Sequence, residues 1–389
     1  MKYLTRTVWI LSIVSLFNDI SSEILYPVMP LFLSSIGFSS VLIGLLEGFA
    51  EATAGLSKGY FGRWSDSIGR RLPFVNAGYF LSALSKPMLA AFTHPAWIFT
   101  ARATDRLGKG IRTAARDSIL SDESTPENKG KVFGFHKTMD TFGATIGPIL
   151  ALIFLYYYPA KYTWIFLIAF VPALLGTLLT FFVNEKNAPP PTKVSFRLSQ
   201  TFDYLKTAGS DYRKLILALL LFALFNSSDL FLLMRIKQAG LSDQYVIGCY
   251  ILYNLVFALA AFPFGHLADS LGMKKTMLFG LGIFVLVYAG FGFNTSLAGF
   301  ILLFVLYGIY AASTDGISKA LISNMVPRTE TASAIGTYTG LSSVMVLLAS
   351  TLAGVIWKYV SPQAVFSISA IGVAISAVFL FTINIKEKH

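Results

Sequence analysis

Apolar segments long enough to cross a lipid bilayer follow one another along almost the whole chain. A helix needs about 20 apolar residues to cross the hydrocarbon core. Hydrophobic residues make up 55% of the 389 residues and charged residues only 13%, a balance that no soluble domain of this length needs for its core. The chain is therefore predicted to be an all-α polytopic membrane protein with twelve spans. We place them near 8–34, 41–62, 72–92, 97–119, 131–157, 163–184, 214–236, 244–265, 274–293, 297–324, 332–358 and 363–384.

Basic residues gather in the short connections at one end of these spans. The net charge of +11 would permit a nucleic-acid partner, but the distribution between apolar runs is the positive-inside pattern of membrane proteins. We therefore predict no nucleic-acid partner and place both termini and the central connection in the cytoplasm. The orientation rests on Lys2, Arg6, Arg63, Arg70, Arg71, Lys129, Lys131, Lys274, Lys275, Arg328, Lys386 and Lys388.

One long polar connection divides the chain. It contains three consecutive prolines, 189–191, which cannot continue a helix. We expect bundles over 1–184 and 214–389 joined by a cytoplasmic linker over 185–213, with an amphipathic surface helix near 196–206. Asp19 and Glu23 interrupt the first apolar run and no small-residue cleavage site follows it. That run is therefore expected to be a retained helix and not a signal peptide.

A short charged motif occurs twice. GRWSDSIGRR follows the second span and GHLADSLGMKK follows the eighth, at the same place in each half. A repeat of this kind indicates two related halves, the architecture of transporters that work by alternating access. The shared positions, with the basic residues after the first copy, are Gly62, Asp66, Gly69, Arg70, Arg71, Gly265, Asp269 and Gly272.

With twelve spans, a basic linker and this duplicated loop, the chain resembles the major facilitator superfamily over essentially its whole length. The resemblance implies two pseudo-symmetric six-helix bundles in a multi-pass protein of the cytoplasmic (inner) membrane, acting as a monomer among lipids. It implies a small-molecule substrate and no cofactor beyond a proton gradient. It also implies that Asp66 and its arginines form a gating network at the cytoplasmic helix ends. The alternative is that Arg70 and Arg71 only anchor topology.

Two further helices resemble the family in part. Arg102 stands about twenty residues before Asp122, as does an arginine linked to proton transfer in proton-coupled members. Gly143, Gly147 and Pro148 match the core of a motif seen in antiporters, but the glycine pair that usually follows is absent. The same small residues could serve only to pack two helices closely.

Carboxylates within the predicted spans are the sharper evidence, because a charge near the bilayer centre is costly and rarely idle. Asp19 and Glu23 lie one turn apart in the first span, and Glu47 and Glu51 repeat that spacing in the second. Four carboxylates on adjacent helices can share protons, so we predict that they couple transport to a proton gradient. The alternative is that they form structural ion pairs with nearby bases.

Those bases are concentrated in the fourth span, where Arg102, Arg106, Lys109 and Arg116 fall on one helical face. So much positive charge cannot face lipid, and an excess of bases over carboxylates favours an anionic group on the substrate. The second half offers mainly amide and aromatic groups. The predicted substrate-binding residues are Asn18, Lys86, Arg102, Arg106, Lys109, Lys137, Asp140, Asn226, Asp229, Tyr250, Asn254, Tyr310 and Asp315.

Several functions stay open at this point. We favour proton-driven export of an organic anion, zwitterion or metal chelate, over uptake by a symporter and export of amphipathic drugs. A membrane-embedded enzyme using His136 or His94 is a remote alternative, because no H-E-x-x-H or serine nucleophile motif accompanies them. The single cysteine, Cys249, excludes an internal disulfide, and no metal site is predicted.

Overall fold

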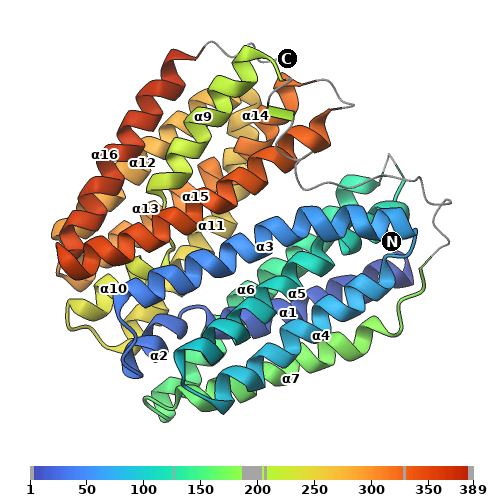
Figure 1. The fold of residues 1–389 in the computed structure, drawn as a ribbon, viewed down its shortest axis with the longest axis horizontal. Coiled ribbons are helices and arrows are strands. Elements are labelled where there is room, and N and C mark those ends of the chain that lie inside the picture. The colour runs from blue at the N-terminus through green and yellow to red at the C-terminus, as the bar shows by residue number, and fades with distance from the viewer. Residues whose placement is uncertain (1–3, 126–127, 186–203, 206–207, 327–329, 384–389) are drawn as a thin grey trace. The chain divides into compact units, whose positions relative to one another are not determined.

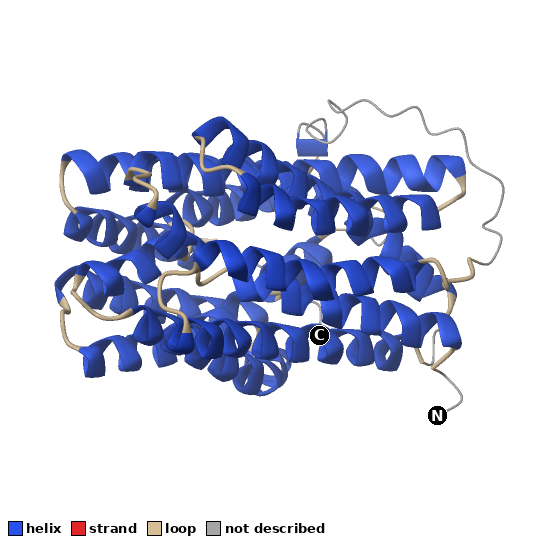
Figure 2. Cartoon of the chain, turned by 90° about the horizontal axis from the view of Figure 1, so that it is seen from below, coloured by secondary structure: helices blue, strands red, loops and turns tan. Residues whose placement is uncertain are grey.

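The computed structural model describes the chain except for residues 1–3, 126–127, 186–203, 206–207, 327–329 and 384–389. Within the described residues every regular element is a helix (Figure 2). This confirms the predicted all-α class. The expected amphipathic helix near 196–206 lies almost wholly outside the described residues.

The chain forms two compact units (Figure 1). Unit 1 comprises Met1–Ile36 and Phe49–Phe196, and unit 2 comprises Gly37–Gly48 and Arg197–His389. The helix Ser40–Ile68 contributes residues to both units. The first six spans are formed by α1 (Arg6–Leu25), α2 (Met29–Ser35), α3 (Ser40–Ile68), α4 (Leu72–Ala91), α5 (Pro95–Asp122), α6 (Lys129–Tyr157) and α7 (Tyr162–Thr180).

The second half contains the remaining spans. They are formed by α9 (Ser210–Phe225), α10 (Leu230–Gln238), α11 (Asp243–Leu271), α12 (Met273–Phe293), α13 (Leu297–Thr314), α14 (Ile317–Met325), α15 (Thr331–Tyr359) and α16 (Pro362–Thr382). Each predicted span coincides with one helix or with two consecutive ones. Among the described residues, ten segments are long and apolar enough to cross a membrane by themselves, and α4 and α5 are not among them.

Three spans predicted as continuous helices are interrupted. The first breaks between α1 and α2, where proline stands in the first turn of α2. The seventh breaks over the polar residues between Phe225 and Leu230, and the tenth breaks at Asp315 and Gly316. Gly316 has a φ of +79°, a conformation that glycine adopts without strain. Proline, polar residues and glycine therefore interrupt the helices at these three points although the apolar pattern continues.

In unit 1, α1 packs against α5, α6 and α7, and α4 packs against α5 and α7. The approach of α6 to α1 is very close. A Cβ added to Gly143 would lie 2.6 Å from the carbonyl oxygen of Leu16, and one added to Gly147 would lie 2.7 Å from that of Ile20. Only glycine fits at such a contact, so the small residues of α6 serve helix packing.

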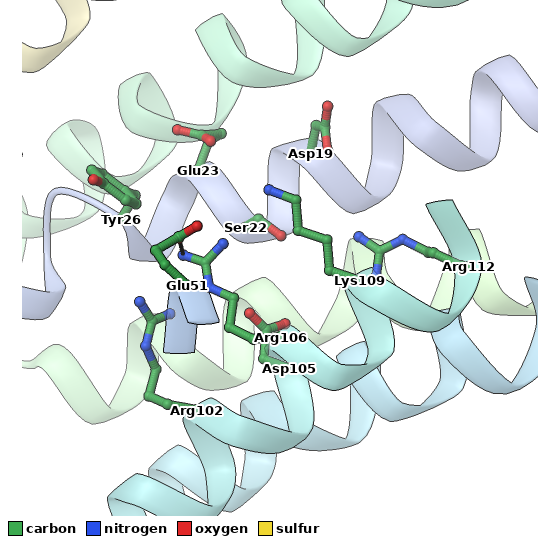
Figure 3. A pocket seen from close by; sticks show the side chains of 10 residues that line it. All are labelled: Asp19, Ser22, Glu23, Tyr26, Glu51, Arg102, Asp105, Arg106, Lys109 and Arg112. Atoms are coloured by element: carbon green, nitrogen blue, oxygen red, sulfur yellow. Dashed lines mark ion pairs between the residues drawn. The ribbon is translucent and has the colours of Figure 1, made fainter. Parts of the chain in front are cut away.

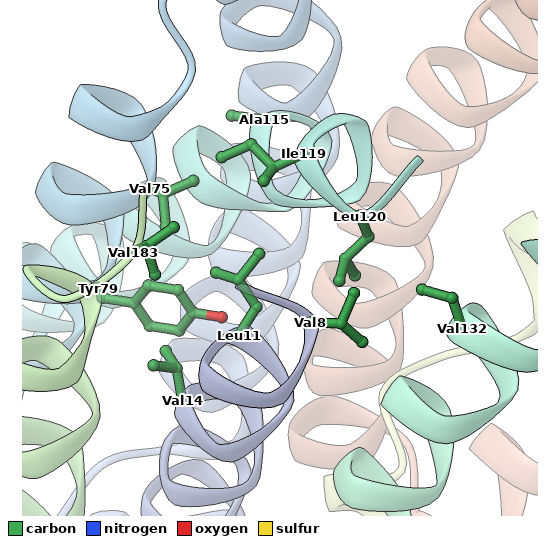
Figure 4. Close-up of a cluster of buried hydrophobic side chains, with 10 residues drawn as sticks. All are labelled: Val8, Leu11, Val14, Val75, Tyr79, Ala115, Ile119, Leu120, Val132 and Val183. Atoms are coloured by element: carbon green, nitrogen blue, oxygen red, sulfur yellow. The ribbon is translucent and has the colours of Figure 1, made fainter. Parts of the chain in front are cut away.

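A cluster of buried hydrophobic side chains joins α1, α4 and α5 of unit 1 (Figure 4). Leu11 and Val14 of α1 meet Val75 of α4 and Ile119 of α5 there, each with little or no exposed surface. Burying one such side chain contributes ~1.5–3 kcal/mol. The cluster therefore holds the ends of three helices that also carry the charged groups described below.

Candidate functional site

A charged pocket lies in unit 1, and we call it the ionic pocket. It has a volume of about 150 Å³. Figure 3 shows carboxylates from α1 and α3 facing a row of bases from α5. The lining residues are Asp19, Ser22, Glu23, Tyr26, Glu51, Arg102, Asp105, Arg106, Lys109 and Arg112.

Helical spacing brings these groups together. Asp19, Ser22, Glu23 and Tyr26 recur every three or four residues, so they share one face of α1. Prediction from sequence found the two carboxylates but not Ser22 and Tyr26, although the same spacing identifies them. On α5 the lining carries Arg102, Arg106 and Lys109, as predicted, but not Arg116, which pairs with Asp117 at 2.9 Å. The spacing of polar residues in the sequence thus predicts which side of α1 and of α5 lines the pocket.

Two ion pairs order the pocket. The Lys86 ammonium contacts Asp105 at 2.5 Å between Nζ and Oδ1, and these side chains are only 1% and 11% exposed. An Arg106 guanidinium nitrogen lies 3.3 Å from Oε1 of Glu51. Lys86 therefore lies behind the lining and holds Asp105, whereas Arg106 and Glu51 pair within the pocket itself. Lys109 extends into the part of the pocket beside α1, and its ammonium lies on the side of Asp19 (Figure 3).

Arg112 is held by uncharged partners. Its Nη1 donates a hydrogen bond to Ser82 Oγ at 2.6 Å, and its guanidinium carbon lies 4.6 Å from the ring centre of Tyr79. A guanidinium over an aromatic face is stabilised without consuming a carboxylate. With Asp105 assigned to Lys86, the lining holds three carboxylates against four bases. The formal charge of the ionic pocket is therefore +1 when all groups are ionised.

The other predicted residues of the first half lie elsewhere. Asn18 is buried, and its amide nitrogen lies 3.5 Å from Oδ1 of Asp19. Glu47 is 1% exposed on the part of α3 that belongs to unit 2. Lys137 is exposed on α6, and Asp140 lies 3.8 Å from His136 on the same helix. None of these four is in the pocket lining.

A second pocket lies in unit 2, and we call it the tyrosine pocket. It has a volume of about 330 Å³ and contains four of the predicted residues, Asn226, Asp229, Tyr310 and Asp315. Tyr250 and Asn254 are not in its lining; the neighbouring α11 residue Tyr253 is. The full lining is Phe222, Asn226, Asp229, Tyr253, Phe257, Met277, Tyr307, Tyr310, Ala311, Thr314, Asp315, Ser318 and Tyr338.

Side-chain contacts hold the helix ends beside the repeated loops. Glu185 accepts hydrogen bonds from the backbone nitrogens of Arg71, at 2.7 Å, and Leu72, at 2.9 Å, and so caps the start of α4. The Arg71 side chain pairs with Asp122 at the end of α5. In unit 2, Lys274 instead donates to the carbonyl oxygen of Ile383 at 2.6 Å, near the end of α16.

The glycines of these loops have separate roles. Gly69 and Gly272 have φ angles of +68° and +98°, which permit the turn after each long helix. A Cβ on Gly62 would lie 2.8 Å from the Cβ of Ala114, so Gly62 allows α3 to approach α5, whereas Gly265 has open space around it. Arg70 is exposed. The side chains of Asp66 and Asp269 are outside the described set, and their gating role stays a prediction.

The linker residue Tyr204 makes a further side-chain contact. Tyr204 donates a hydrogen bond to Oε2 of Glu330 at 2.9 Å, just before α15 begins. Partial burial, together with this bond, raises the pKa of Tyr204 to about 12. The phenol therefore stays protonated and keeps donating at neutral pH.

A family model of the Major Facilitator Superfamily matches residues 11–253 and 246–389 of the chain. The chain belongs to the Major Facilitator Superfamily. This confirms the resemblance inferred from the duplicated loop, and the family's members are transporters. The protein is therefore a multi-pass membrane transporter that binds a small-molecule substrate.

Similar proteins span nearly the whole chain. An uncharacterized MFS-type transporter of Methanocaldococcus jannaschii is 34% identical over 388 residues, covering 98% of this chain and 96% of that protein. A multi-drug resistance efflux pump PmrA homolog of Lactococcus lactis is 22% identical, covering 98% and 95%. The crystal structure of a mutant of the nucleoside transporter NupG superposes with a TM-score of 0.81 at 13% identity, covering 97% of this chain and 100% of that one. That likeness confirms the two-bundle fold.

Proposed function

We propose that the protein is a proton-coupled secondary transporter of the cytoplasmic membrane that exports a small organic solute carrying an anionic group. The ionic pocket is the observation that carries this proposal. Seven charged groups from α1, α3 and α5, beside the Lys86–Asp105 pair, gather in membrane-spanning helices around one small cavity. Such groups are costly in a membrane and mark substrate and proton pathways.

An anionic group fits the charge and the size of this pocket. The lining has one more base than it has carboxylates once Asp105 is assigned to Lys86. A volume of about 150 Å³ admits a carboxylate or phosphate group but not a drug-sized molecule. Arg102 and Arg106 offer planar guanidinium forks that bind such an oxyanion through paired hydrogen bonds.

The electrostatics of the ionic pocket support proton coupling. Lys109 interacts electrostatically with both Asp19 and Glu51. Protonation of a lining carboxylate removes one negative charge and leaves the pocket more positive. Two unit charges about 8 Å apart interact by ~2 kcal/mol at an effective dielectric constant of about 20. One bound proton should therefore strengthen anion binding by about 30-fold, and binding should tighten as pH falls.

The direction of transport has two candidates. The efflux pump homolog of Lactococcus lactis, which aligns over nearly the whole chain, supports export. The electrostatic linkage supports a second candidate, because a proton and an anion that favour each other's binding travel together. Cotransport with protons would run as uptake under an inward proton gradient.

Transport by purified protein in liposomes tests the proposal. Vesicles loaded with the pH-sensitive dye pyranine would be exposed to citrate, glutamate and inorganic phosphate in turn. We expect one of these probes to move protons across the membrane only when the protein is present. The sign of that proton movement separates exchange from cotransport, and thus export from uptake.

Variants identify the coupling residue and the anion site. Replacing the coupling carboxylate among Asp19, Glu23, Glu47 and Glu51 by its amide should keep solute exchange but abolish the response to a pH gradient. Arg106→Lys should weaken anion binding although the charge is kept. Asp211→Asn, at an exposed position before the first apolar run of unit 2, is the matched control. Four amide variants that all retained pH-driven accumulation would refute proton coupling through these residues.

A further inference from the structure

The lining of the tyrosine pocket presents hydrogen-bond acceptors and no basic side chain. Asp229 and Asp315 line it, and no lysine, arginine or histidine is among its lining residues. Asn226 donates from Nδ2 to the Tyr310 hydroxyl at 3.3 Å, which leaves its Oδ1 as an acceptor. That oxygen is buried and has no hydrogen-bond partner among the described residues. A buried acceptor of this kind calls for a donor from a ligand or water.

Two broken helices meet at this pocket. Asn226 is the C-cap residue that follows α9, and Asp315 is the C-cap residue that follows α13. The carboxyl end of a helix carries a partial negative charge. Interrupted membrane helices whose ends face a cavity are typical of binding sites, and their carboxyl ends favour cations. The pocket therefore combines two carboxylates with the negative ends of two helices.

Aromatic rings form the rest of the wall. Tyr307 donates its hydroxyl proton to Oδ1 of Asp229 at 2.6 Å, which orients the carboxylate. The Tyr307 ring centre lies 5.1 Å from that of Tyr253 and 5.2 Å from that of Tyr310. Aromatic faces attract cations, most strongly where water is excluded. A small inorganic cation would require a cage of oxygen ligands, and the described residues contain no group of three or more His, Cys, Asp or Glu side chains that could hold a metal ion.

We propose that the tyrosine pocket binds the protonated amino group of an organic amine. The ammonium would donate hydrogen bonds to Asp229 and to the side-chain carbonyl oxygen of Asn226, and the apolar body of the amine would lie against the tyrosine rings. A volume of about 330 Å³ accommodates an amine that carries one aromatic ring. The assignment deepens the proposed transport function, on which it rests, by giving the substrate class an amino group.

Calorimetric titration of the purified, detergent-solubilised protein tests the site directly. The probe is 2-phenylethylammonium, compared with the uncharged 2-phenylethanol and the anionic 3-phenylpropionate. We expect the ammonium to bind and the alcohol to bind at least about tenfold more weakly, because the alcohol cannot pair with Asp229. Equal binding of ammonium and alcohol would overturn the proposal, since the pocket would then select only for apolar character.

Matched variants locate the binding. Asp229→Asn should weaken ammonium binding about tenfold or more, whereas Asp243→Asn should not, because Asp243 pairs with Lys237 outside the pocket. Tyr253→Leu keeps every charge but removes an aromatic face, and it should weaken binding several-fold even if the Asp229 variant fails to fold. Unchanged affinity in Tyr253→Leu and in folded Asp229→Asn would refute the assignment.

The same titration separates this proposal from the transport proposal. Arg106→Lys alters the ionic pocket of unit 1 and should leave ammonium binding unchanged. If the protein binds the ammonium but shows no proton-coupled transport, only the proposed transport mechanism is refuted. Absence of ammonium binding in a protein that transports anions would sink the amine site alone.

Discussion

Replacing Lys86 by methionine should destabilise the protein far more than replacing Lys86 and Asp105 together. The pair is buried, with 1% and 11% of the side chains exposed and 2.5 Å between Nζ and Oδ1. Removing one partner of a buried ion pair costs ~3–5 kcal/mol, because the remaining charge is left without compensation. Arg102 and Arg106 also act electrostatically on Asp105, so we expect the lower end, ~3 kcal/mol.

The double variant Lys86→Met/Asp105→Asn removes both charges and should lie within ~1 kcal/mol of the native protein. Unfolding of detergent-solubilised protein by heat or denaturant can be monitored by tryptophan fluorescence. Four of the five tryptophans, at 9, 64, 97 and 164, belong to unit 1, so the signal reports mainly on that unit. If the single variant loses less than ~1 kcal/mol, or if the double variant is no more stable than the single one, Lys86 does not neutralise Asp105. The charge count of the ionic pocket would then be wrong.

Three further substitutions, two of them with a control on the same helix, test packing and capping. Gly147→Ala should destabilise the protein by ~1–3 kcal/mol, because the added Cβ would meet the backbone of α1. Gly134→Ala on the same helix has open space around it and should stabilise the protein slightly. The two variants should therefore shift the thermal midpoint in opposite directions. Arg235→Gln should lower the free energy of unfolding by ~2 kcal/mol, since the buried guanidinium donates hydrogen bonds to backbone carbonyls at the end of α12. The control Lys237→Gln, at an exposed position of the same helix, should lower it by less than ~0.5 kcal/mol. Glu185→Ala should lower the thermal midpoint through loss of ~1–2 kcal/mol of capping at α4, and an unchanged midpoint would show that the cap is replaced by water.

Sequence patterns predicted the spans and one side of the ionic pocket because both depend on regular spacing. Membrane helices need apolar runs of a set length, and charges on α5 must share a face to avoid lipid. Asp19, Glu23 and Arg106 were found in this way. The pairing of Lys86 with Asp105 was not, since the contact depends on how α4 lies against α5, which spacing along one helix does not specify.

The tyrosine pocket was predicted only in part for a similar reason. Asn226, Asp229 and Asp315 stand out as polar residues in apolar runs, but the helix breaks beside them were missed. Hydropathy averages over many residues and does not register a short break. The sequence analysis selected Tyr250 and not Tyr253, because both lie in one apolar helix. Only the packing of α11 against α13 shows that Tyr253 lines the pocket.

The charge of α5 has a consequence for how the protein is made. Five charged residues, from Arg102 to Arg112, stand in the middle of this helix, and each charged residue at a helix centre costs ~2.5–3.5 kcal/mol when the translocon releases it into lipid. A cost on the order of 10 kcal/mol prevents α5 from leaving the translocon as a single segment. Lys86 of α4 pairs with Asp105 and Glu51 of α3 lies 3.3 Å from Arg106, so we expect α5 to partition into the bilayer together with the helices that precede it. Stable insertion of α5 should therefore depend on α3 and α4 being present when it leaves the translocon.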